Sequence, residues 1–119
     1  MSHHAQSPEI AAIQIATERI VTQLRRQTRE QARLIRSGAA GELTEADVER
    51  MARDITAAAH AQLDAVTQDW QSASDDPGMQ ATRREVAQLM AAGSRQVDAD
   101  LREAWQAQHE KVARRRWFR

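Results

Sequence analysis

The stretch Gly41–Met51, GELTEADVERM, carries the signals that begin a helix, and it thereby divides the chain. Thr44 is a favourable N-cap residue, and Asp47 stands three positions later, where an acidic side chain completes a capping box. Leu43 and Val48 flank the cap at the spacing of a hydrophobic staple. A helix therefore begins at about residue 44, and the residues before this stretch belong to a separate element.

Upstream of this stretch, the periodicity predicts a helix over residues 8–37. Ser7 can cap this helix, and Pro8 then occupies the first helical position, where its missing N–H is not needed. Gly38 and Gly41 end the helix. The apolar positions recur at three- and four-residue steps and share one face, which comprises Ile10, Ile13, Thr17, Ile20, Leu24, Leu34 and Ile35.

Two further helices are predicted downstream, over residues 44–72 and 79–117, and turn-forming residues separate them. The apolar stripe of the second helix comprises Val48, Met51, Ile55, Ala59, Leu63, Val66 and Trp70. The stripe of the third comprises Val86, Met90, Gly93, Val97, Leu101, Trp105 and Val112. Gly93-Ser94 could break the third helix, but we favour continuity because the apolar phase carries across this point.

These helices predict an all-α fold, an up-down-up antiparallel three-helix bundle with a long third helix. The connections are short, so successive helices lie antiparallel. We expect a disordered leader over residues 1–6 and a single helical-bundle domain over residues 7–119. Only 26 of the 119 residues are large and apolar, so the core is thin. The helices must approach one another closely or share apolar surface with a partner.

The composition also restricts the chemistry that the chain can perform. Cysteine is absent, which excludes disulfides and thiolate metal sites. No apolar run approaches the ~20 residues that span a membrane, and no secretory signal is visible, so we expect a cytoplasmic protein. His60 and His109 lack a metal-binding residue four positions away, and no phosphate-binding loop or nucleophile motif occurs. We therefore expect no enzymatic activity, no metal and no cofactor.

Charge is segregated along the chain, although its 17 basic and 17 acidic residues cancel. From Arg19 to Arg36 there are six arginines and one acidic residue, whereas Glu42–Glu49 holds four acidic residues and no basic one. On a helical wheel these arginines lie away from the apolar stripe and form an exposed surface. The candidate partner-binding residues on this surface are Arg25, Arg26, Arg29, Arg33 and Arg36.

The C-terminal end combines basic and aromatic side chains, and the candidate partner-binding residues there are Arg114, Arg115, Arg116, Trp117, Phe118 and Arg119. Trp and Arg are enriched in binding hot spots, so one interpretation is that this tail docks on a partner. A second is that the tail folds back and caps the end of the bundle. The basic residues can also pair with the acidic start of the second helix, which lies at the same end of an up-down-up bundle.

We predict a non-enzymatic protein-interaction module: an adaptor, inhibitor or assembly subunit. Abundant Ala and Arg indicates a bacterial genome or a mobile element as its source. A homo-oligomer is one form of such an interaction, because a thin core gains from burial against a second copy. The alternative function is a nucleic-acid-binding accessory protein, in which arginines contact phosphates and the aromatic side chains stack on bases.

Overall fold

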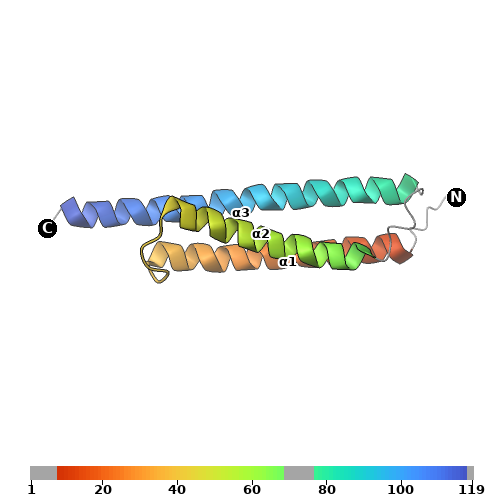
Figure 1. Ribbon diagram of the computed structural model, residues 1–119, viewed down its shortest axis with the longest axis horizontal. Helices are drawn as coiled ribbons and strands as arrows, with labels where there is room; N and C mark the ends of the chain where they lie inside the picture. The colour runs from red at the N-terminus through yellow and green to blue at the C-terminus, as the bar shows by residue number, and fades with distance from the viewer. Residues whose placement is uncertain (1–7, 69–76, 118–119) are drawn as a thin grey trace.

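The computed structural model describes residues 8–68 and 77–117, and three α-helices account for most of these ranges (Figure 1). α1 spans Pro8–Ser37, α2 spans Glu45–Thr67 and α3 spans Pro77–Trp117. α1 and α3 run in the same direction, and α2 runs back against both. This arrangement confirms the predicted all-α, up-down-up three-helix bundle.

The bounds of the helices follow from their capping chemistry. At the start of α2, the Asp47 amide donates to the Thr44 hydroxyl over 3.1 Å, and the Thr44 amide donates to the Asp47 carboxylate over 2.9 Å. The hydrogen bond from the Thr44 amide to the carboxylate, followed by one from the Thr44 side chain, holds the pKa of Asp47 below its usual value. α3 begins two residues earlier than predicted, because Pro77 is compatible with the first turn of a helix. Positions 69–72 of the predicted second helix, with Trp70, lie outside the described residues.

α3 continues without interruption through Gly93 and Ser94, as predicted. The Ser94 hydroxyl donates to the carbonyl of Met90 over 2.9 Å and leaves the helix intact. A Cβ atom on Gly93 would lie only 2.9 Å from Cδ2 of Leu24 in α1. The missing side chain therefore allows α1 and α3 to pack closely at the middle of the bundle.

The core is a narrow strip between the three helices, and small or polar side chains occupy part of it. Thr17 and Thr28 are buried, and each hydroxyl donates to the carbonyl four residues earlier over 2.7 Å, so neither lacks a partner. In α2, Ala52 is buried together with Val48, Ala59 and Leu63 of the predicted stripe, whereas Met51 and Ile55 of that stripe are only partly buried. A small side chain at this point lets α2 lie close to its neighbours.

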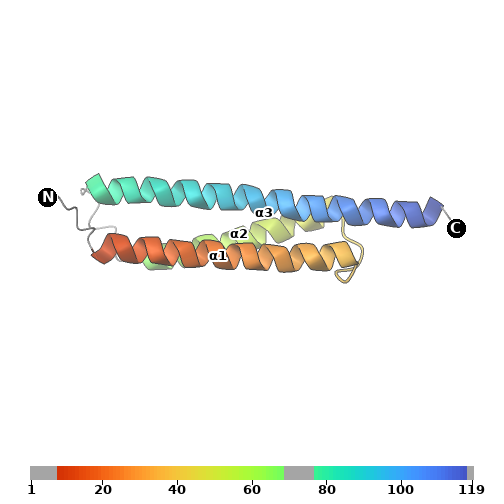
Figure 2. The ribbon, with the colours of Figure 1, turned by 180° about the vertical axis from the view of Figure 1, so that it is seen from behind.

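The molecule is a rod of 71 × 27 × 17 Å. Its radius of gyration is 19.0 Å, against about 13–14 Å for a compact domain of this length. α2 crosses one side of the α1/α3 pair, and the opposite side has no helix over it, as Figure 2 shows. Within residues 8–68 and 77–117, no helix is both long and apolar enough to cross a membrane.

Candidate interaction surfaces

The arginine face of α1, formed by the exposed residues Arg25, Arg26, Arg29, Arg33 and Arg36, lies on the outside of the bundle as predicted. It contains a shallow hollow of about 380 Å³, in which Arg33 pairs with Glu30 over 2.7 Å. Arg36 pairs with Glu103 of α3 over 3.3 Å. Arg25, Arg26 and Arg29 form no ion pair with any described residue. Internal pairing thus accounts for only two of the five arginines.

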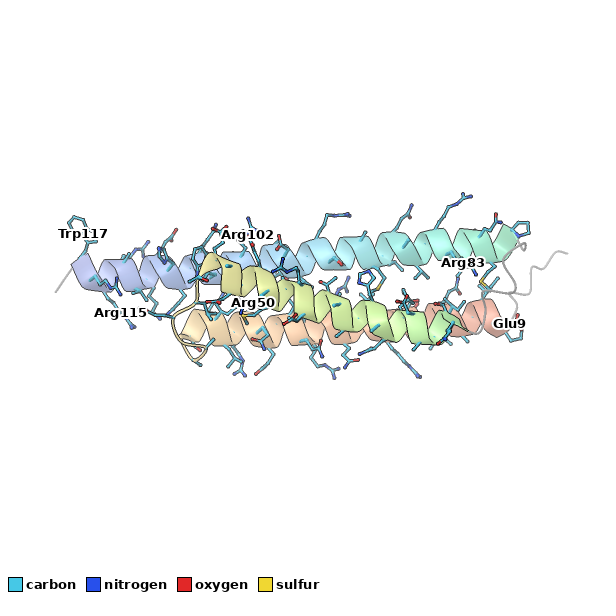
Figure 3. All side chains as sticks on the ribbon, viewed as in Figure 1. Glu9, Arg50, Arg83, Arg102, Arg115 and Trp117 are labelled. Carbon is cyan, nitrogen blue, oxygen red and sulfur yellow. The ribbon has the colours of Figure 1, made fainter. Side chains whose placement is uncertain are left out.

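The second surface is the overhang, the segment Lys111–Trp117 with which α3 projects past the end of α1 (Figure 1). Trp117 is 86% exposed, and Figure 3 shows that its side chain and that of Arg115 leave the projecting helix on different sides. The proposed folding back of the tail is therefore wrong for Trp117, because α3 stays helical and extended to this residue. Phe118 and Arg119 lie outside the described residues.

The base of the overhang is fixed to the loop between α1 and α2. The indole Nε1–H of Trp105 donates to the carbonyl of Leu43 over 2.7 Å, and the ring stacks on His109 at a centroid distance of 5.2 Å. The guanidinium of Arg116 pairs with the carboxylate of Glu42, the residue before Leu43, over 3.3 Å. Trp105, predicted to lie in the core, is partly buried and packs against the core. Its hydrogen bond to Leu43, which we call the Trp105 clamp, also joins α3 to the loop. The overhang therefore projects from a well-anchored part of the bundle.

Some of the charge segregation is explained by contacts within the chain. The guanidinium nitrogens of Arg102 in α3 lie 3.9 Å from a carboxylate oxygen of Glu45, 3.7 Å from one of Glu49 and 3.8 Å from one of Asp98. The pairs of Arg102 with Glu45 and Glu49, and that of Arg116 with Glu42, link the acidic segment at the start of α2 to the C-terminal half of α3, whereas Asp98 lies on α3 itself. The charge pattern predicted such pairing for the C-terminal arginines, of which Arg116 is one. These ion pairs leave Arg114 and Arg115 without an ion pair to any residue that the structure describes. Those two arginines remain available to a ligand.

One feature of the surface is not visible in the sequence pattern. Ile15 and Leu89 are 52% and 49% exposed, and neither belongs to a predicted apolar stripe. Leu89 borders a groove of about 420 Å³ between α1 and α3, on the side away from α2. The sequence shows only that a large aliphatic residue stands outside the predicted apolar stripe of its helix. Whether such a residue is exposed can be decided only once the position of α2 is known.

The chain matches no family model, no curated protein and no solved structure. Among residues 8–68 and 77–117, no three side chains of the metal-binding types gather into a group that could hold an ion. The chemistry of the exposed surfaces is therefore the basis on which a function is inferred.

Proposed function

We propose that this chain is a non-enzymatic protein-interaction module and that the overhang is its main contact. The observation that carries the proposal is the exposure of Trp117, at 86%, on a helical arm beside Arg114 and Arg115, which form no ion pair with the residues that the structure describes. A Trp side chain removes roughly 150–250 Å² of surface from water when it is buried, so it gains most from a partner. The matching surface is an apolar pocket rimmed by carboxylates.

The arm is ordered before binding, which favours this use. Residues 111–117 are the last two turns of the 41-residue helix α3, and the Trp105 clamp holds their base. A partner that receives them need not order a flexible segment, and the entropic cost of binding is correspondingly smaller. The contact resembles in principle the insertion of a helix into a groove. Within this proposal, the chain acts as an adaptor, inhibitor or assembly subunit in the cytoplasm of a bacterium or in a mobile element.

Nucleic-acid binding is the second candidate, and the arginine face favours it. Arg25, Arg29 and Arg33 follow one another at intervals of about 6 Å along α1, and their guanidinium groups are exposed. Such a row can contact successive phosphates. Glu30 lies within the same hollow, however, and the chain carries no net charge that would attract a polyanion over a distance. We therefore rank this function second.

The proposal is tested by capture of partners from a nuclease-treated lysate of the source cells. The baits are the native chain, Trp117→Ala and the double variant Arg114→Glu/Arg115→Glu. Arg95→Glu is the control, because it reverses one exposed charge of α3 in the part of the helix that precedes the overhang. We expect a set of proteins that the native chain and the control retain and that both overhang variants lose. Equal retention by all four chains overturns the proposal.

The same four chains are titrated against duplex DNA, single-stranded DNA and RNA by fluorescence anisotropy over a salt series. Binding that weakens steeply with salt, and that the overhang variants leave unchanged, would transfer the function to the arginine face and to nucleic acid. Absence of binding at low salt would remove the second candidate.

A further inference from the structure

Figure 2 shows the side of the α1/α3 pair that α2 does not cover. A groove runs between α1 and α3 on this side, and residues at four- and seven-residue steps on each helix border it. We call this side the open face. Its α1 line is Val21, Arg25, Arg29 and Arg36, and its α3 line is Leu89, Gln96, Asp100 and Glu103, which pairs with Arg36.

The two lines are in axial register. Arg36 and Glu103 are in contact at 3.3 Å, and they are 67 residues apart in the chain. Because α1 and α3 run in the same direction, the same offset sets Arg29 level with Gln96 and Thr22 level with Leu89. The open face therefore has an apolar end, at Val21 and Leu89, and a charged end. At the charged end the basic residues lie on α1 and the acidic residues, Asp100 and Glu103, lie on α3.

This pattern is complementary to itself under one symmetry operation. A two-fold axis parallel to the helices, in the plane of the open face, sets α1 of one copy over α3 of the other at the same level. Each Arg36 then meets the Glu103 of the partner copy, and the apolar ends coincide. A two-fold axis across the helices instead sets α1 over α1, which opposes arginine to arginine or to Val21. Charge and hydrophobicity thus select the parallel arrangement.

We infer that the open face is a self-association site and that two copies of this chain pair through it with their helices parallel. This inference goes beyond the proposed function, because it concerns a surface other than the overhang. From Val21 to Arg36 the face is about 22 Å long, and two helices give it a width of about 20 Å. The pair would bury on the order of 900 Å², in the range of weak, transient interfaces.

The arrangement has a consequence for the overhang. Because the two copies point in the same direction, the Lys111–Trp117 segments of both project from the same end of the dimer. A partner with two binding pockets would then engage both arms, and the second contact would be intramolecular.

The inference is tested with two charge reversals whose defects correct each other. Arg36→Glu brings an acidic α1 against the acidic α3 of an identical copy, and Glu103→Arg brings two basic lines together. In sedimentation velocity we expect each variant alone to dimerise about tenfold or more weakly than the native chain.

An equimolar mixture of the two variants should recover dimers. In the mixed pair, one contact joins the two substituted side chains, which carry opposite charges, and the other contact joins a native Arg36 to a native Glu103. The control is Arg95→Glu, which lies away from the open face and should dimerise normally.

Orientation is read from single cysteines, since the native chain has none. Val21→Cys and Leu89→Cys mixed under mild oxidation should form the crosslinked pair faster than either variant alone. Native chains that stay monomeric from micromolar to millimolar concentration, or mixtures that show no recovery, overturn the inference. A monomeric chain whose overhang variants still lose their partners would leave the proposed function intact, so the two failures are distinguishable.

Discussion

At the scale of single residues, Gly93 sets the separation of α1 and α3. Alanine there gains about 0.5–1 kcal/mol in helix propensity, and its Cβ must displace only the flexible end of Leu24, next to which a groove is open. We expect Gly93→Ala to change the free energy of unfolding by less than about 1 kcal/mol, and Gly93→Leu to lower it by about 1–3 kcal/mol through overpacking. Urea unfolding followed by circular dichroism measures both. If Gly93→Ala and Gly93→Leu changed the free energy of unfolding equally little, this role of Gly93 would be contradicted.

The capping box of α2 gives a pH-dependent prediction, also at the residue scale. The folded state lowers the pKa of Asp47, chiefly through the hydrogen bond from the Thr44 amide. The carboxylate therefore stabilises the fold fully above its unfolded pKa, and this contribution is lost as the pH falls through the folded pKa. We expect Asp47→Ala to lower the unfolding midpoint at neutral pH and to approach the native midpoint in acid.

The control for the capping box is Thr44→Ala. This change removes the N-cap hydroxyl and should cost about 1 kcal/mol at neutral pH. If Asp47→Ala lowered the unfolding midpoint by the same amount at all pH values, the carboxylate would not act through its charge.

At the scale of the element, the overhang should contribute binding and little stability. Its one ion pair to a described residue, Arg116–Glu42, joins side chains that are 74% and 88% exposed, and such pairs contribute about 0–1 kcal/mol. A chain that ends at Glu110 should therefore unfold within a few degrees of the native chain and lose the partners that Trp117 recruits. A large drop in melting temperature on truncation would show that the overhang belongs to the folding unit.

The helices themselves could be predicted from sequence where local chemistry decides. Thr44 with Asp47 located the start of α2, and Gly38 located the end of α1, because caps act over a few residues. The start of α3 was misplaced because Pro77 favours a turn and a first helical turn alike. The buried Ala52 was missed because small residues carry a weak hydrophobic signal, and its burial depends on where α2 crosses its neighbours.

At the scale of the whole molecule, the candidate site was only partly predictable. The arginine face and Trp117 could be identified from sequence, since charge segregation and an aromatic side chain beyond the apolar stripe are local features. The open face could not, because it exists only where α2 leaves one side of α1 and α3 uncovered. The ion pair between Arg36 and Glu103 likewise depends on which helices are neighbours.

The shape of the rod distinguishes the ways in which two copies can associate. In dilute solution, small-angle X-ray scattering should give a radius of gyration near 19.0 Å. Pairing through the open face stacks the rods side by side, so higher concentration should raise the cross-sectional radius while the longest dimension stays near 71 Å. Association through the overhang, end to end, would instead nearly double the longest dimension at constant cross-section. Because Arg36→Glu weakens pairing through the open face about tenfold or more, its cross-sectional radius should rise only at correspondingly higher concentrations.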